Sequence, residues 1–417
     1  MIEKEAFIAA LLPICDTVCE YDRARGKLRV RKTSLASGLE DKWYTVEELR
    51  DIFRDNGGVS AEKSVWMRYL SSENLRSFFY EKERNESFRL RFRQGGVGCR
   101  QYDIRIDRIN DKVLVISGRD TQEQEIDALT GALIGLARAV DGDTQPSPET
   151  WQLMIEGLFT TVTNVNFNEK TIRDLIDRVH SEKTRLTPNC SGCASRCGRN
   201  DDYDMRLLWN ADADTRSLKS LILFGVRGMA AYAHHAMALG YSDDAVNRFF
   251  AKALFAVGED WGMGDLLPVV MEVGEKNLRC MALLDRANTE TYGHPVPTTV
   301  PLTVEPGPFI VITGHDLHDL KLLLEQTEGK GINIYTHGEM LPAHAYPELK
   351  KYSHLKGNFG TAWQNQTKEF ADIPAPILFT TNCLMPPRSS YADRVFTTAV
   401  VSYPEMQHIG DDKDFTP

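Results

Sequence analysis

Three apolar segments near the end of the chain each finish at a residue type that binds metal ions. They are FIVITG before His315, INIYTHG before Glu339 and PILFTTN before Cys383. Between the first two segments, Leu317 to Thr327 has apolar residues at the spacing of a helix. Strands separated by helical crossovers pair in parallel, and the carboxyl ends of parallel strands meet at one edge of a sheet. The pattern therefore predicts a Rossmann-like parallel α/β domain with an imidazole, a carboxylate and a thiol at one edge.

The stretch before this domain has the periodicity of helices, because apolar residues recur at i, i+3 and i+4. The clearest segments are 151–166, 216–239, 245–257 and 263–285, and the sequence YGHP at 292–295 ends the pattern. We therefore expect a helical bundle. His234 and His235 lie inside one of these helices, where packing in the bundle explains both residues.

Residues 1–122 predict a small α+β module. Thr45 to Asn56 reads as a helix, with Thr45 at the N-cap and Glu48 at the capping-box position. Three segments then have the alternation of antiparallel strands: SFRLRF (87–92), QYDIRIDRI (101–109) and KVLVIS (112–117). Helices followed by such a meander are typical of a PAS-like sensor module.

The predicted fold class is α+β and multidomain, with the α+β module at 1–122, the helical bundle at 123–300 and the α/β domain at 301–417. A net charge of −10 argues against broad nucleic-acid binding, which needs a basic surface. We expect no membrane span, because no apolar run reaches about 18 residues. The amino terminus carries Glu3 and Glu5 where a signal peptide needs positive charge, so we expect a cytoplasmic protein.

The cysteines favour metal binding over a disulfide framework, because they are clustered in a chain expected to be cytoplasmic. Cys190, Cys193 and Cys197 have a spacing that lets three thiolates meet at one zinc ion or one accessory iron–sulfur cluster. The alternative is a loop of thiols that bind nothing. Cys15 and Cys19 are four residues apart on a predicted amphipathic helix, where they share one face.

Longer motifs in the α/β domain resemble one known family. They are TGHDLHDLKLLLEQTEGKGINIYTHGEMLPAHAYPELKKY, KGNFGTAWQNQ and LFTTNC, and from about residue 131 to 417 the sequence resembles the hybrid-cluster protein (prismane) family, the hydroxylamine reductases. The resemblance implies that His315, Glu339 and Cys383 are ligands of an iron–sulfur–oxygen cluster. It also implies reduction of hydroxylamine to ammonia and water, with nitric oxide as a related substrate and an electron-donor protein as partner.

Each of these ligands has an ordinary alternative when taken alone. His315 could cap a helix, Glu339 could be a surface carboxylate, and Cys383 could be a small buried apolar residue. Together, their mixture of nitrogen, oxygen and sulfur suits a cluster that combines thiolate-bound and oxygen-bridged irons. His337, close to Glu339, is the candidate to orient it from behind, since metal ligands need hydrogen-bonding partners.

The resemblance also sets an alternative to enzymatic activity. Family members begin with a cysteine motif and continue into a further α/β domain that supplies other ligands, so we expect three of the seven cluster ligands in this sequence and a truncated α/β part. The segment Asp127 to Leu133 resembles the opening of a diguanylate-cyclase (GGDEF) domain, which follows sensor modules. The second hypothesis is therefore an inactive fusion or fragment, with a sensor or interaction module and a vestigial cluster site.

Overall fold

The chain divides into two compact units, Met1–Gln124 and Glu125–Pro417. No helix in the described part of the chain is long and apolar enough to cross a membrane. The computed structural model describes residues 4–12, 15–33, 38–55, 70–80, 86–93, 99–140, 145–187, 202–381 and 383–416.

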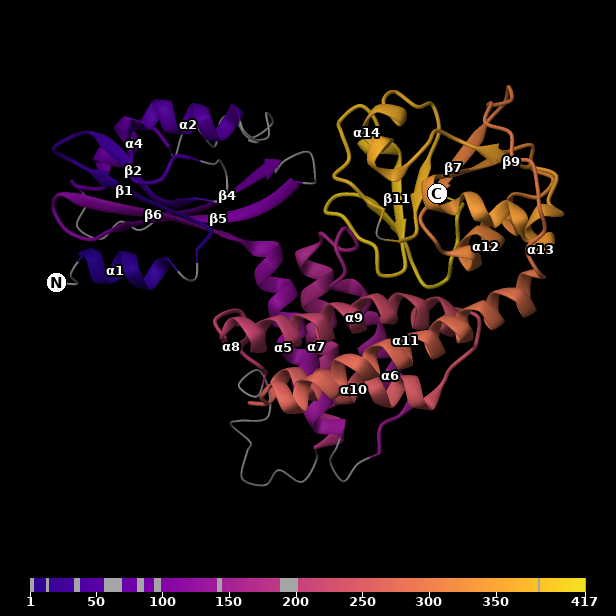
Figure 1. Cartoon of the computed structure of the whole chain (residues 1–417). Coiled ribbons are helices and arrows are strands. Elements are labelled where there is room, and N and C mark those ends of the chain that lie inside the picture. The colour runs from indigo at the N-terminus through magenta and orange to yellow at the C-terminus, as the bar shows by residue number, and fades with distance from the viewer. Residues whose placement is uncertain are drawn as a thin grey trace. The chain divides into compact units, whose positions relative to one another are not determined.

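The first unit is built on an antiparallel sheet with the strand order β3-β2-β1-β6-β5-β4 (Figure 1). The predicted meander is confirmed as β4, β5 and β6, whereas the pattern did not reveal β1 and β2. Helix α1 packs on one face, and α2 and α4 pack on the other. The elements are α1 (Lys4–Leu11), β1 (Thr17–Asp22), β2 (Lys27–Thr33), β3 (Trp43–Thr45), α2 (Val46–Asp55), α4 (Ser72–Ser77), β4 (Glu86–Arg93), β5 (Cys99–Arg108) and β6 (Val113–Asp120).

The prediction that one helix carries both Cys15 and Cys19 is wrong. Helix α1 ends before Cys15, and Cys19 lies in the central strand β1. Successive strand residues point to opposite faces, so Val18 packs with α1 while Cys19 joins the core under α2 and α4. The i, i+4 spacing of the two thiols is therefore accidental, and burial raises the pKa of the Cys19 thiol to about 12.

The capping box predicted at the start of α2 is confirmed. The Glu48 backbone N–H donates to Thr45 Oγ1 at 3.1 Å, and the Thr45 backbone N–H donates to Glu48 Oε2 at 2.8 Å. Two backbone donors that an isolated helix end would leave unpaired are thus bonded within the protein. Because the box joins the end of β3 to α2, it fixes the direction in which that helix leaves the sheet.

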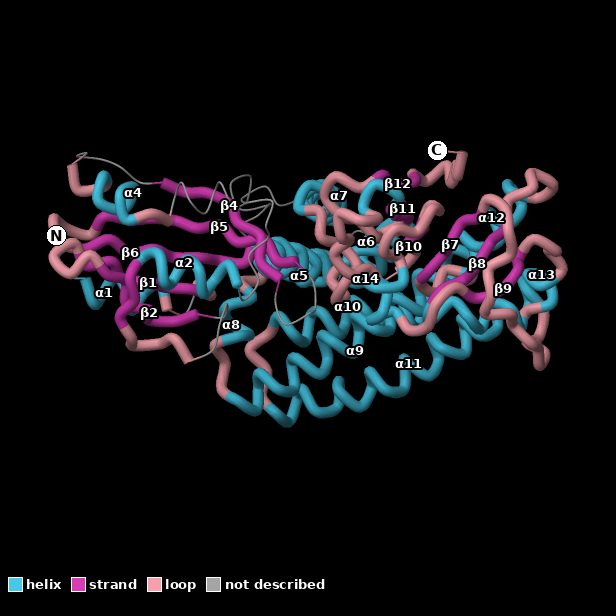
Figure 2. Tube along the Cα trace, turned by 90° about the horizontal axis from the view of Figure 1, so that it is seen from above, coloured by secondary structure: helices cyan, strands magenta, loops and turns pink. Residues whose placement is uncertain are grey.

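The second unit begins with a helical bundle, and the helices predicted at 216–239, 245–257 and 263–285 are confirmed (Figure 2). The segment predicted at 151–166 is helical only as far as Thr160. Aspartates cap two of the helices: Asp212 accepts from backbone N–H groups at the start of α9, and Asp243 does so for α10. The helices are α5 (Thr121–Val140), α6 (Pro148–Thr160), α7 (Glu169–Leu186), α8 (Met205–Trp209), α9 (Ala213–Ala238), α10 (Asp244–Gly258) and α11 (Met263–Tyr292).

The second unit continues into a fully parallel sheet with the order β12-β11-β10-β7-β8-β9. The three predicted strands and the helix at 317–327 are confirmed, as is the predicted α+β multidomain class. The elements are β7 (Phe309–Thr313), α12 (Leu317–Thr327), β8 (Asn333–His337), η3 (Gly338–Ala345), α13 (Pro347–Lys350), β9 (Leu355–Asn358), η4 (Trp363–Asn365), α14 (Gln366–Glu369), β10 (Ile377–Phe379), η5 (Ala392–Arg394), β11 (Val395–Thr398) and β12 (Gln407–Ile409).

Bundle and sheet share one hydrophobic core. The same buried cluster contains Phe159 from α6, Val311 from β7 and Phe379 from β10. The two parts belong to one compact unit, so the boundary expected between residues 300 and 301 stays a prediction. Each Å² of apolar surface buried between the bundle and the sheet stabilises the folded unit by about 25 cal/mol. A shift of the helices relative to the strands would expose part of this surface, so the shared core fixes the strand ends relative to the helices.

The first testable prediction concerns the capping box. Thr45→Ala removes the side-chain acceptor at the N-terminus of α2 and should lower the free energy of unfolding of the first unit by about 1 kcal/mol. Urea denaturation of the full chain, followed through the first transition, measures this. Glu48→Gln is the matched control because glutamine also completes a capping box; a loss in the control as large as that in Thr45→Ala would contradict the assignment.

Candidate metal centre

The three candidate ligands follow neighbouring strands of the parallel sheet. His315 comes after β7, Glu339 after β8 and Cys383 after β10, and β7 is hydrogen-bonded between the other two strands. Parallel strands present their carboxyl ends at the same edge, which is where ligands of such sheets bind. The sheet thus brings three segments that are far apart in sequence to one edge.

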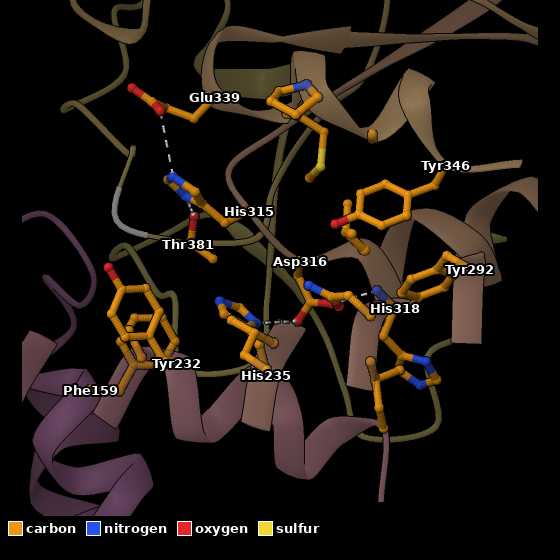
Figure 3. Close-up of a pocket in the computed structure, with 18 of the residues that line it drawn as sticks. Phe159, Tyr232, His235, Tyr292, His315, Asp316, His318, Glu339, Tyr346 and Thr381 are labelled. Carbon is orange, nitrogen blue, oxygen red and sulfur yellow. Dashed lines mark hydrogen bonds and ion pairs between the residues drawn. The ribbon is translucent and has the colours of Figure 1, made fainter. Parts of the chain in front are cut away.

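His315 and Glu339 face each other at this edge (Figure 3). His315 Nε2 lies 3.7 Å from Glu339 Oε2, and the two side chains are 42% and 53% exposed. His315 Nδ1 is hydrogen-bonded to Thr381 Oγ1 at 2.9 Å, so Nε2 is the nitrogen that remains to bind a metal. Burial, and then the nearby His235, lower the pKa of His315. The neutral ring that results near pH 7 is the form that coordinates metal ions.

Cys383 lies beside this pair but deeper in the protein, with 4% of the residue exposed. Its backbone N–H donates to the Thr381 carbonyl at 2.8 Å, and its carbonyl accepts from Gln366 Nε2 at 2.7 Å. Burial, and then the negative charge of Glu339, raise the pKa of the thiol to about 12. Cys383 is therefore a neutral thiol in the protein alone, and binding a metal through its sulfur requires loss of that proton.

Glycine is required directly before His315. Gly314 has φ +116°, and a Cβ there would lie 2.8 Å from the Thr381 backbone nitrogen and also crowd the hydroxyls of Thr380 and Thr381. Only a residue without a Cβ allows the loop after β7 to approach the loop after β10 so closely. This approach lets Thr381 reach the His315 ring.

A cavity of about 420 Å³ opens beside His315 and Glu339, between the bundle and the sheet edge. We call it the helix–sheet chamber. Sequence patterns gave no sign of it, because its walls come from helices and loops that only the packed unit brings together. Its lining includes Phe159, Tyr232, His235, Leu284, Tyr292, His315, Asp316, Glu339, Met340, Tyr346 and Thr381.

Comparison with known proteins decides the family. The sequence matches the Prismane/CO dehydrogenase family over residues 121–417. The chain belongs to this family. It is 46% identical over 313 residues to the hydroxylamine reductase of Thermodesulfovibrio yellowstonii, a match that covers 70% of this chain and 58% of that protein. The hydroxylamine reductases of Syntrophobacter fumaroxidans (45% over 314 residues; 70% and 58%) and Solidesulfovibrio magneticus (43% over 334 residues; 75% and 60%) are similar.

The chain thus spans about three-fifths of the length of these curated relatives. The match begins inside the first turn of α5, so the antiparallel sheet of the first unit lies outside it. The segment Asp127 to Leu133, which resembles a GGDEF domain, lies within the family match; that second resemblance stays a prediction.

Membership of the prismane family implies a hybrid iron–sulfur cluster, and the side chains at the sheet edge have the donor chemistry for one. Imidazole nitrogen and carboxylate oxygen suit oxygen-bridged iron, and thiolate suits iron bound by sulfide. In the part of the chain that the structure describes, no three His, Cys, Asp or Glu side chains are grouped to hold one ion. The ligands of a cluster bind different irons and need not meet at a single point, so the ligand set stays a prediction.

His337 has partners other than Glu339. It is fully buried, its Nε2 lies 3.0 Å from Glu369 Oε2, and its Nδ1 lies 3.1 Å from Thr313 Oγ1. Through Thr313, His337 holds the end of β7; its expected role behind Glu339 stays a prediction.

The cysteine triplet Cys190, Cys193 and Cys197 lies outside the described residues, so the expected zinc or accessory iron–sulfur site also stays a prediction.

Sequence reasoning missed His235. The packing interpretation holds for its neighbour His234, which is 9% exposed and packs on Phe159 with ring centroids 5.2 Å apart. His235 also packs on Phe159, with ring centroids 5.7 Å apart, and in addition lines the helix–sheet chamber, where its Nδ1 lies 3.5 Å from Asp316 Oδ2. Consecutive residues on a helix point about 100° apart, so two adjacent histidines cannot both face the core of the bundle. The pair of adjacent histidines was therefore the sequence signal that one of them faces away from the bundle core.

A prediction follows for Gly314. Gly314→Ala places a Cβ at a positive φ and against the loop after β10, so it should lower the free energy of unfolding by about 2–4 kcal/mol. Gly329→Ala is the matched control, because Gly329 has φ +73° with nothing within 4 Å of a Cβ, and should cost only about 1 kcal/mol. Urea denaturation of the second unit measures both; equal losses would show that crowding at Gly314 does not matter.

A second prediction concerns acid stability. Burial, and then His235, lower the pKa of His234 from 6.5 to about 4. The unfolded chain therefore binds a proton between pH 6.5 and 4 that the folded chain does not, so stability is full above pH 6.5 and is lost as the pH falls. Between pH 7 and pH 5, the wild type should lose about 2 kcal/mol more than His234→Gln, as urea denaturation at the two pH values measures. Parallel losses would refute the shift.

Proposed function

We propose that this chain carries the catalytic edge of a hydroxylamine reductase. The reaction adds two electrons and two protons to hydroxylamine, breaks the N–O bond and releases ammonia and water. The observation that supports the proposal is that His315, Glu339 and Cys383 follow three neighbouring strands at one edge of the parallel sheet, with His315 and Glu339 beside an open chamber. The names of the curated relatives support it.

In this proposal His315, Glu339 and Cys383 hold iron. The bound cluster supplies electrons and an iron that polarises the substrate's oxygen or nitrogen. The protein sets the geometry: Thr381 fixes the His315 ring through Nδ1 at 2.9 Å, and Gly314 allows the approach of the two loops. The exposed face of Glu339 leaves room for a small nitrogenous substrate, hydroxylamine first and nitric oxide as a related one. Electrons come from a separate donor protein.

A second candidate is an inactive fusion or fragment in which the first unit acts as a sensor or interaction module. The antiparallel α+β fold of that unit and its position outside the family match favour it. The two candidates differ in whether iron binds to this chain.

The deciding experiment measures iron and acid-labile sulfide per chain after anaerobic purification and reconstitution. We expect several irons per chain in the wild type and loss of most of them in Cys383→Ala. Cys280→Ala is the matched control, because Cys280 is also fully buried but lies in the helical bundle, where its thiol donates to the Met229 carbonyl.

The outcomes separate the candidates. Iron that survives in Cys280→Ala but not in Cys383→Ala supports the proposed site, and hydroxylamine-dependent oxidation of a reduced viologen dye then tests turnover. Absence of iron from the wild type would reject the enzymatic proposal for this chain and leave the second candidate. Equal iron in all three proteins would place the metal elsewhere.

A further inference from the structure

Polar groups with unused hydrogen-bonding capacity face the helix–sheet chamber. The Tyr292 hydroxyl has no hydrogen-bond partner among the described residues, although Tyr292 is 0% exposed. His235 Nδ1 also makes no hydrogen bond within the described chain and only faces Asp316 Oδ2 at 3.5 Å. Unpaired buried polar atoms are rare in native proteins and cost about 1–3 kcal/mol each. Two such atoms belong to residues that line this one cavity, where a bound molecule could pair with them.

Asp316 gives the chamber a fixed negative charge. Its side chain is 5% exposed, and Oδ1 accepts from the backbone N–H groups of His318 and Asp319 at 2.9 and 3.0 Å. Oδ2 is left to face the chamber and His235. Lys413 Nζ lies 2.9 Å from Oδ1 of the neighbouring Asp319 and forms an ion pair with that carboxylate. A buried carboxylate oxygen with capacity to spare binds a cationic N–H donor best.

The chamber is large, and apolar side chains form part of its wall beside polar residues such as Asn288, His315 and Glu339. Its walls include Phe159, Val162, Leu239 and Leu284. Ammonia or hydroxylamine is about the size of a water molecule, which occupies about 30 Å³ in the liquid, whereas the chamber measures about 420 Å³. Cavities of about 300–1,000 Å³ with apolar walls and a few polar groups bind organic molecules.

We propose that the helix–sheet chamber binds a protonated primary amine with an apolar body. The ammonium group lies at Asp316 Oδ2 and donates to the Tyr292 oxygen, while the apolar part packs between Phe159 and Leu284. The role of this site in catalysis rests on the proposed function. In that reaction an N-substituted hydroxylamine, R–NHOH, takes two electrons from the donor protein and two protons, its N–O bond breaks, and R–NH₂ and water leave. The substrate class then includes organic hydroxylamines, whose products are such amines.

Binding can be tested on the full chain without added iron. Isothermal titration with benzylammonium chloride near pH 7 should show saturable binding at one site per chain. Benzyl alcohol, which has the same apolar body without the charge, should bind at least about tenfold more weakly. Tyr292→Phe should weaken benzylammonium binding about tenfold, the effect of one hydrogen bond, and Asp316→Asn should abolish it.

Two controls keep the test decisive. Tyr335→Phe alters another fully buried tyrosine, whose hydroxyl accepts from the Glu305 backbone N–H, and should leave binding unchanged. Tyr292→Phe removes a hydroxyl without a partner among the described residues, so its melting temperature without ligand should equal or exceed that of the wild type. This variant therefore carries the test even if Asp316→Asn, which loses a helix cap, does not fold.

Three results would overturn the proposal: no saturable heat with benzylammonium, equal affinity for benzyl alcohol, or wild-type affinity in Tyr292→Phe. Because no iron is present, the outcome is independent of the proposed function. A chain that binds the amine but never iron keeps the amine site and loses the reductase proposal, and a chain that binds iron but no amine does the reverse.

Discussion

The hydrogen-bonded alignment of β10, β7 and β8 is the constraint on which the candidate site depends. In the parallel register Phe379 lies opposite Thr313, and Thr313 lies opposite His337, so the three strands end at the same level. Each strand is followed at once by a turn that carries one candidate ligand. A shift of one residue in this register would reverse which side chains face the core, and the three donors would no longer share one edge.

The helical bundle supplies what the sheet cannot. A sheet edge is an open surface, and the bundle closes one side of it because Phe159 and the strands belong to the same buried cluster. The wall formed in this way brings His235 against Asp316, and the Tyr292 hydroxyl has no hydrogen-bond partner among the described residues. Packing of the apolar faces offsets the cost of burying such groups, and the chamber combines apolar side chains with charged and polar ones.

Two side chains at the sheet edge have shifted pKa values. His315 is held neutral by burial and by His235, whereas the pKa of Cys383 is raised by burial and by Glu339. A cation at the edge would favour the thiolate over the thiol and would pair with the exposed carboxylate.

The sequence by itself determined three strands of the parallel sheet (β7, β8 and β10), the helix at 317–327 and the capping box, because periodicity and capping are local properties of the chain. It also placed His315, Glu339 and Cys383 at strand ends, and its motifs indicated the family. It did not reveal β9, β11 and β12. It was wrong about the helix at Cys15 and Cys19, since only pairing with distant strands makes that segment β1. Tertiary structure alone decided that His337 bonds Glu369 and that His235 faces Asp316. It also decided that a chamber lies between the helical bundle and the sheet edge. These contacts join segments far apart in sequence, and no local pattern encodes a distance across a folded core.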